Sequence, residues 1–525
     1  MDASALQWEL GRLVEAEIIY QRGLPPQATY TFKHALIQVA AYESLLKSTR
    51  QQYHRQIAQV LEAQFPETAE TQPELLAYHY TEAGLNEQAI GYWQRAGERA
   101  FQRSANLESV QHLTRGLQLL AALPETPVRD SQELDLQIAL GPVLMARQGF
   151  ASAEVAQVYA RARELCQRVG DTPRLFPVLW GLWAFYAVHG ELQTAQHLAE
   201  RLLALAHSAQ DPALLMQAHR ALGQTLHYLG ALAPAHTHLE QSLALYDPQR
   251  HHAHTFLYGQ DSGVFCLALS AEVLALQGFP DQALQRIQEA LRLARELAHP
   301  LSLAVVLTIA LRFYQLRRER HMVQELTTTL TTLATEHGFA QLVASGTIMQ
   351  SWALVEQGQH TAGIDQMRQG LARYKLTGAQ AAVSYYQALL AEAYGKGGQS
   401  DEGLRVVAEA LVFMQQTANR VYEAELYRVQ GELLRVQQST GQPAEGTRQT
   451  QSEMAESFLQ ALGIARHQQA KLLELRAAMS LSQLWQQQGK WADARALLAE
   501  VYCWFTEGFD TADLQEAKAL LDALA

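Results

Sequence analysis

The sequence predicts an all-α protein in which helix pairs stack into a solenoid, and two observations support this fold class. First, a pattern of small residue, large residue, glycine, small residue and large residue recurs about every forty residues. Clear copies begin at Ala77, Gly223, Ala271, Ala391 and Ser482. Second, the chain from residue 73 onward has the apolar spacing of amphipathic helices. Because one helix pair cannot bury its own apolar face, the copies must stack.

The first sixty-odd residues do not follow the repeat. Their pattern predicts a helix over residues 6–17, short strands over 18–21 and 29–32, and one or two helices over 34–62. A helix, a hairpin and a helix in this order are typical of the end of a winged-helix module. We therefore expect a winged-helix remnant over residues 1–66, followed by the first helical repeats over 73–122.

The repeats of about forty residues are expected over 131–435, with C-terminal repeats and a cap over 453–525. The predicted joints between helices are Gly149, Gly190, Gly230, Gly278, Arg317, Gly358 and Gly398. Asp211-Pro212 and Asp171-Thr172-Pro173 each place a capping acid before a proline, which predicts helix starts. Residues 247–263 are an insertion. Residues 436–452, rich in Gln, Thr, Ser and Gly, predict a flexible loop.

Composition narrows the possible functions of this 525-residue chain. A formal net charge of −12 argues against a nucleic-acid partner, which needs clustered Lys and Arg. Cys166, Cys266 and Cys503 are far apart in helical segments, which indicates core-filling thiols in a reducing compartment. The start of the chain is not a secretory signal and no apolar run has membrane-spanning length. We therefore expect a cytoplasmic protein without a membrane partner.

The repeats resemble the tetratricopeptide family, in the long-helix variety found in bacterial signalling ATPases. Residues 13–17, 20–26 and 30–38 are similar to the end of the winged-helix segment in predicted STAND-type ATPases, which are often fused to class III adenylate or guanylate cyclases. The resemblance implies a right-handed α-solenoid of tetratricopeptide-like helix pairs with a small N-terminal winged-helix remnant. It also implies a non-catalytic regulatory or sensor role toward an upstream P-loop ATPase or cyclase polypeptide.

No catalytic motif accompanies this resemblance. A phosphate-binding loop needs Gly-Lys followed by Ser or Thr, whereas this chain has Gly395-Lys396-Gly397 and Gly489-Lys490-Trp491. We therefore expect no enzyme activity and no cofactor. A free-standing scaffold that binds a protein partner is the alternative function. A DNA-binding regulator is disfavoured because the winged-helix segment has few basic residues.

Histidines crowd the region around the insertion, at His219, His227, His236, His238, His251, His252 and His254. We interpret those of the insertion as part of a polar loop, because cysteine or carboxylate ligands do not accompany them at metal-site spacing. Residues 259–263 contain a serine between glycines, but the spacing does not match a nucleophile turn. We expect neither a metal site nor a catalytic serine.

A binding groove is the preferred hypothesis for the site. In tetratricopeptide stacks the first helix of each pair lines the concave face, and this rule selects Gln217, Arg220, Gln224, His227, Phe265, Glu272, Tyr314, Trp352, Tyr385 and Glu392. Such aromatic and polar groups suit a protein partner or a small ligand. The alternative is that several of them seal neighbouring repeats. Trp180, Trp183, Phe185 and Tyr186 are expected in the core.

Overall fold

The computed structural model describes residues 3–25, 28–170, 173–251, 253–440 and 447–525. Across these residues it contains 28 α-helices and one two-stranded sheet, so the predicted all-α fold class is confirmed. The chain divides into two compact units. The first comprises Met1–Glu98 and Gln111–Pro124, and the second comprises Arg99–Val110 and Glu125–Ala525.

The first unit begins with the elements that the sequence predicts, with bounds that differ by at most three residues. They are α1 (Ala3–Glu15), β1 (Ile19–Arg22), β2 (Thr29–Phe32), α2 (Ala35–Glu43) and α3 (Lys47–Gln64). The strands pair antiparallel, with Ile19 opposite Phe32. Gly23 follows β1 at a φ of 88°, which a residue without Cβ adopts readily. Pro26, in the predicted hairpin turn, lies outside the described residues.

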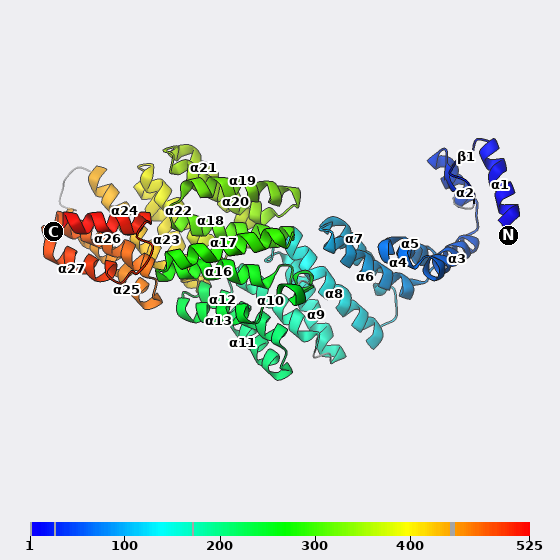
Figure 1. Ribbon diagram of the computed structural model, residues 1–525, viewed down its shortest axis with the longest axis horizontal. Helices are drawn as coiled ribbons and strands as arrows, with labels where there is room; N and C mark the ends of the chain where they lie inside the picture. Colours follow the sequence, from blue (N-terminus) through cyan, green and yellow to red (C-terminus); the bar gives the residue numbers. More distant parts are fainter. Residues whose placement is uncertain (1–2, 26–27, 171–172, 252, 441–446) are drawn as a thin grey trace. The chain divides into compact units, whose positions relative to one another are not determined.

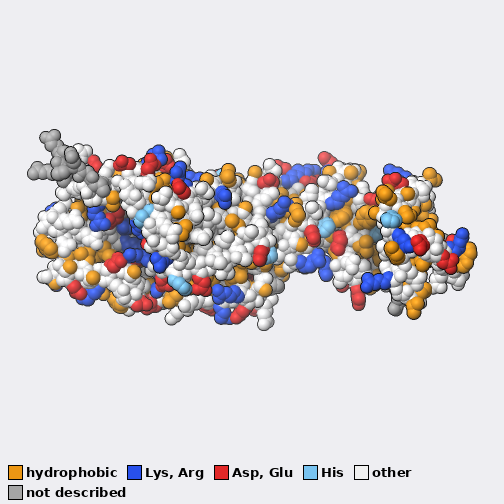
Figure 2. All heavy atoms as spheres, turned by 90° about the horizontal axis from the view of Figure 1, so that it is seen from above, with side chains coloured by type: hydrophobic (Ala, Val, Ile, Leu, Met, Phe, Trp, Pro, Cys, Tyr) orange, Lys and Arg blue, Asp and Glu red, His pale blue; other side chains and the backbone are white. Residues whose placement is uncertain are grey.

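The remaining helices of this part of the chain are α4 (Pro66–Thr71), α5 (Pro73–Glu82), α6 (Asn86–Gln102) and α7 (Asn106–Ala121). Ala58, Leu76 and Tyr80 form a small buried core. Many other apolar side chains of the unit are exposed, among them Trp8, Leu36 and Leu46, and Figure 2 shows orange side chains gathered over this unit. The apolar burial that stabilises the unit is therefore concentrated in α3, α5, α6 and α7.

The second unit is a continuous stack of antiparallel helix pairs (Figure 1). Its helices are α8 (Pro127–Gln148), α9 (Ala153–Val169), α10 (Leu175–His189), α11 (Leu192–Ala209), α12 (Pro212–Tyr228), α13 (Leu232–Ala244), α14 (Pro248–His251), α15 (His254–Leu257), α16 (Ser262–Gln277), α17 (Pro280–Glu296), α18 (Pro300–Leu316), α19 (Arg320–Glu336), α20 (Ala340–Val355), α21 (His360–Leu376), α22 (Val383–Lys396), α23 (Ser400–Thr417), α24 (Glu423–Thr440), α25 (Thr447–Gln468), α26 (Lys471–Gln487), α27 (Trp491–Tyr502) and α28 (Ala512–Ala523). No described helix is both long and apolar enough to span a membrane.

The predicted joints end helices as expected. Gly149, Gly190 and Gly278 cap the C-termini of α8, α10 and α16 at positive φ, and Arg317 caps α18. At the start of α12, the Asp211 carboxylate accepts hydrogen bonds from the backbone N–H groups of Ala213 and Leu214. Local chain chemistry therefore sets the boundaries of the pairs. Asp171 and Thr172 lie outside the described residues.

The predicted flexible loop over 436–452 is wrong for the residues that the structure describes. Residues 436–440 belong to α24 and residues 447–452 belong to α25, while 441–446 lie outside the description. Polar composition misled the prediction, because Gln, Arg, Glu and Ser cost little in a helix whose polar face meets water. The insertion over 247–263 contains the two short helices α14 and α15.

Pairs that are distant along the chain touch one another. The backbone N–H groups of Gln380 and Ala381 both donate to the carbonyl oxygen of Val188, at 2.8 and 3.1 Å. The N–H of Arg420 donates to the carbonyl oxygen of Tyr228 at 2.8 Å. Gly378 lies so close to the Ala151 carbonyl that a Cβ there would be 2.3 Å from the oxygen. The solenoid of the second unit is therefore wound tightly enough for successive turns to contact each other.

Candidate functional site

The inner helices of the second unit enclose a cavity, which we call the inner cavity. It is bordered by the C-terminal end of α8, by the turn after it, and by α10, α12, α16, α18, α20, α21 and α22. About 90 Å³ is open to the centres of water molecules, and the whole void with its mouth is about 950 Å³. Its principal lining residues are Met145, Phe150, Trp180, Trp183, Ala184, Val188, Arg220, Gln224, Tyr228, Gln260, Phe265, Leu301, Thr308, Arg312, Phe339, Leu342, Ser345, Ala381 and Tyr386.

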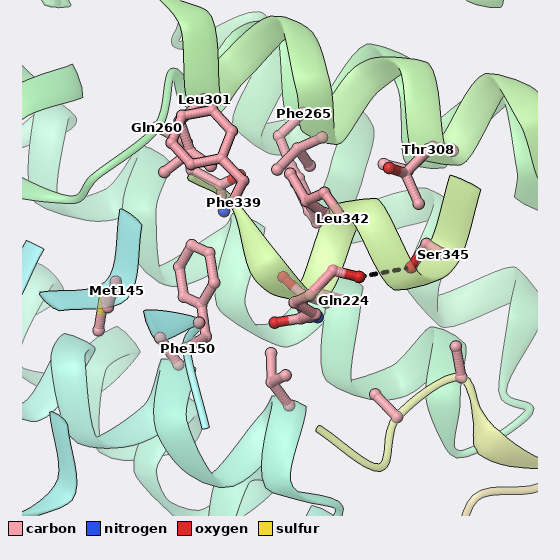
Figure 3. A pocket seen from close by; sticks show the side chains of 18 of the residues that line it. Met145, Phe150, Gln224, Gln260, Phe265, Leu301, Thr308, Phe339, Leu342 and Ser345 are labelled. Carbon is pink, nitrogen blue, oxygen red and sulfur yellow. Dashed lines mark hydrogen bonds between the residues drawn. The ribbon is translucent and has the colours of Figure 1, made fainter. Parts of the chain in front are cut away.

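The lining is largely apolar and aromatic, with a few polar groups. Figure 3 shows Phe150, Phe339 and Gln224 around the space. α10 and α16 are apolar around most of their circumference, because each packs against neighbouring helices and also faces inward. An apolar enclosure with few, separated polar groups is the usual composition of a small-molecule site.

Arg220 is the most unusual residue of this wall. It is 0% exposed, and its guanidinium lies 5.1 Å from the Trp180 ring centroid and 4.5 Å from that of Phe265. Nη1 donates to Ser262 Oγ at 2.9 Å, and the Ser262 hydroxyl donates to Gln217 Oε1 at 2.9 Å. Nε and Nη2 have no hydrogen-bond partner among the described residues. Burial lowers the pKa of Arg220 to about 10, which means that the site holds this cation at an energetic cost.

Arg312, the other charged residue of the lining, is neutralised. Its Nε and Nη2 bind Glu272 at 2.7 to 3.2 Å. Glu272 also accepts a hydrogen bond from the Tyr422 hydroxyl at 2.7 Å, and His227 Nε2 lies 3.7 Å from its Oε1. Burial alone raises the pKa of Glu272, but the Arg312 charge and the hydrogen bonds outweigh it and hold that pKa well below its usual range. Tyr422 precedes α24, so this cluster joins two turns of the solenoid.

A second cavity, which we call the charged cavity, lies among α18, α20, α22, α24, α26 and α28. Its lining carries charges of both signs. Glu425 binds Arg428 bidentately, and Arg476 binds Asp513. Burial raises the pKa of Glu425, but the two arginines outweigh it and lower the pKa to about 2. These carboxylates and guanidinium groups satisfy one another, which is the pattern of an ionic network that fixes repeats together.

The ten residues selected from the sequence do not lie in one groove. Arg220, Gln224 and Phe265 line the inner cavity. Trp352 and Glu392 line the charged cavity. Tyr385 lines a small pocket beside the charged cavity, where its hydroxyl donates to Gln315 Oε1 at 2.9 Å. The remaining members pack or pair within the stack, namely Gln217, His227, Glu272 and Tyr314.

The histidines near the insertion do not gather into one cluster. His251 Nδ1 accepts a hydrogen bond from the Asp247 N–H, and the Nδ1 atoms of His219 and His238 are 3.0 Å apart. His252 lies outside the described residues. Within the described ranges, no three His, Cys, Asp or Glu residues could hold a metal ion together.

In residues 259–263, Asp261 caps α16 by accepting from the Val264 N–H at 3.0 Å. Ser262 follows it and bridges Arg220 and Gln217. Gln217 carries an amide, which cannot serve as a general base. The segment therefore positions Arg220.

Sequence reasoning missed several residues of the cavity wall. Trp180 and Trp183 are buried as expected, but both also border the inner cavity. Phe150, Gln260 and Phe339 lie in or next to turns, where no periodic pattern predicts an inward position. An aromatic residue directly after a turn glycine, Gly149 or Gly338, is the signal that could have identified Phe150 and Phe339.

No protein family model matches the chain. An uncharacterized protein of Rhizobium meliloti (strain 1021) is 26% identical over 490 residues, which cover 92% of this chain and 46% of the relative. The chain therefore spans about half the length of that relative.

Solved helical-repeat structures are similar at low identity. Yeast Tom70 has a TM-score of 0.33 and 10% identity over 90% of this chain and 96% of that one. The human IFIT1 dimer with m7Gppp-AAAA has a TM-score of 0.41 and 13% identity over 78% and 89%. A Rap protein complexed with competence and sporulation factor has a TM-score of 0.36 and 10% identity over 77% and 99%. Similarities at this level carry no argument about this chain. Across its described residues, the second unit is an α-solenoid of antiparallel helix pairs.

Proposed function

We propose that this chain is a non-catalytic sensing and interaction module, in which a ligand in the inner cavity controls how successive turns of the solenoid contact each other. The observation that carries the proposal is the position of the contacts between turns. The carbonyl oxygens of Val188 and Tyr228 accept the hydrogen bonds between turns, and the N–H of Ala381 donates one of these bonds. All three residues line the inner cavity. An occupant of the cavity would therefore touch the residues that join the turns.

The energetic basis is differential affinity. A ligand shifts a conformational equilibrium only if it binds one arrangement better than the other. The inner cavity has walls from both turns, since α10 and α12 belong to one and α20 and α22 to the next. Its shape depends on how closely these turns approach, and an occupant that fits the wound form stabilises that form.

The signalling context is part of the same proposal. The resemblance to STAND-type ATPases suggests that the solenoid regulates a P-loop ATPase or cyclase, and the greater length of the Rhizobium relative is compatible with additional segments in that protein. A change in winding would then be the output. A free-standing scaffold for a protein partner is the alternative, and it requires no ligand in the inner cavity.

Calorimetric titration with octanol and octanoate tests the proposal, because each has a slender apolar body suited to an apolar cavity. Ala184 is 3% exposed and lines the cavity, so Ala184→Leu fills part of the space. Ala496→Leu, at an exposed position on α27, is the matched control. We expect binding of at least one probe to the wild-type chain and the control, with at least a tenfold loss in Ala184→Leu. Absence of binding by both probes, or equal binding by Ala184→Leu, would reject the ligand role and leave the scaffold function.

A further inference from the structure

We propose that the inner cavity is specific for a monocarboxylate with an apolar body, and that Arg220 is the residue that recognises the carboxylate. This inference rests on the proposed function and deepens it by assigning the chemical class of the ligand. It is carried by the unpaired edge of one buried guanidinium, the charge of the cavity wall and the hydrogen-bonding state of its amides.

The unpaired edge is the one that arginines of this chain use to bind carboxylates. Nε and Nη2 present two parallel N–H donors that match two carboxylate oxygens. Arg312 uses this edge to bind Glu272, and Arg428 uses it to bind Glu425. In Arg220 the same two nitrogens have no partner among the described residues, while Nη1 is fixed by Ser262.

Among the described residues, no carboxylate is hydrogen-bonded to Arg220. The carboxylate of Asp261, the residue before Ser262, accepts hydrogen bonds from the Val264 N–H and, at 3.1 Å, from the Tyr246 hydroxyl. None of the described residues that line the cavity is Asp or Glu, although the chain carries a net charge of −12. Glu272 is hydrogen-bonded to Arg312, whereas no carboxylate of the described residues is hydrogen-bonded to Arg220, on which the Asp261 charge acts without a hydrogen bond. A single charge with two donors fits a monoanion better than a phosphate ester, which carries more negative charge.

The stacked rings fix the orientation of the guanidinium. Trp180 and Phe265 lie within 5.1 Å of Arg220 and restrict its rotation. A preoriented donor pair loses little conformational entropy when it binds a ligand. The carbonyl oxygens Oε1 of Gln224 and Gln260, which also line the cavity, have no partner among the described residues. These buried acceptors would gain a partner from a hydroxyl or amino donor on the ligand.

The alternative explanation is that Arg220 is purely structural, held by its two aromatic neighbours and by Ser262. That explanation predicts that the cavity does not discriminate a carboxylate from a neutral molecule of the same shape. It also predicts that removing the guanidinium disturbs the fold more than it disturbs selectivity.

Calorimetric titration with octanoate, octanol, octylammonium and octyl phosphate tests the inference, because these probes share one apolar chain. We expect octanoate to bind the wild-type chain at least tenfold more tightly than the other three. Arg220→Met should reduce octanoate affinity to within about twofold of octanol, because the charge-assisted hydrogen bonds are lost and the apolar contacts remain. Arg292→Met, at an exposed position of α17, should change nothing. Arg220→Lys keeps the charge without the fork and should bind octanoate with intermediate affinity.

Four results separate the possibilities. Equal wild-type affinity for octanoate and octanol would overturn the carboxylate assignment and leave the cavity as a neutral ligand site. Tighter binding of octyl phosphate would also overturn it. Loss of octanol binding together with a lower melting temperature in both Arg220 variants would show that the residue is structural. No binding of any probe to the wild-type chain would reject both the assignment and the proposed function.

Discussion

The Glu272 cluster offers a sharp test of whether the turns are locked together as described. Glu272→Gln keeps the shape of the side chain but leaves the Arg312 guanidinium buried beside an amide. Because Arg312 donates three hydrogen bonds of 2.7 to 3.2 Å to this carboxylate, breaking the pair should cost about 3–5 kcal/mol. The matched variant Tyr422→Phe removes one donor and preserves the ion pair, so its cost should be about 1.5–3 kcal/mol.

The sign of the pH dependence follows from the depressed pKa of Glu272. Its folded pKa lies below the value of about 4.3 for an unfolded glutamate. The stabilisation is therefore present above that unfolded pKa and is lost as the pH falls through it toward the folded pKa. The free-energy difference between the wild-type chain and Glu272→Gln should be largest near neutral pH and should shrink between about pH 5 and pH 3.

Urea unfolding followed by far-UV circular dichroism measures the global cost. Native-state amide exchange at Arg420, whose N–H binds the Tyr228 carbonyl, measures the local cost, because repeat stacks can open in parts. A cost of Glu272→Gln below about 1 kcal/mol near neutral pH would refute the buried ion pair, since uncompensated buried charges cost far more. A difference that does not vary with pH would also refute it.

Three further predictions follow from particular residues. Gly181→Ala should destabilise the second unit by about 1–3 kcal/mol, because the new Cβ would lie 2.1 Å from the buried Tyr159 ring. Gly463 lies on an exposed helix face, and a Cβ added there would have no atom within 4 Å. Gly463→Ala should therefore stabilise the second unit by about 0.5–1 kcal/mol in urea titrations. Equal changes in unfolding free energy for the two glycine variants would contradict this packing. Arg220→Met should raise the melting temperature of the ligand-free chain, because it removes a buried cation with two unpaired nitrogens, and a lower value would count against that reasoning. Purified chain should release no phosphate from ATP, since its Gly-Lys pairs lack the following hydroxyl residue, and turnover lost on a point mutation within this chain would contradict it.

The sequence predicted the features that depend on local chemistry. Joints such as Gly190 and the cap Asp211 follow from conformational preferences within a few residues. The winding of the solenoid could not be predicted in this way, because it is the sum of small rotations between many helix pairs. No short sequence pattern predicts that sum. Of the residues predicted for the groove, all but Glu392 are consequently buried. Arg220 could be selected from its helix position, but its lack of a carboxylate partner is visible only in the fold.

Amide exchange at Gln380, Ala381 and Arg420 tests the central claim most directly, because these N–H groups join successive turns beside the inner cavity. Saturating octanoate should slow exchange at all three amides in the wild-type chain, since binding stabilises the wound form. It should leave them unchanged in Ala184→Leu. Unchanged exchange in a wild-type chain that binds octanoate by calorimetry would contradict the claim that occupancy of the cavity controls contact between the turns.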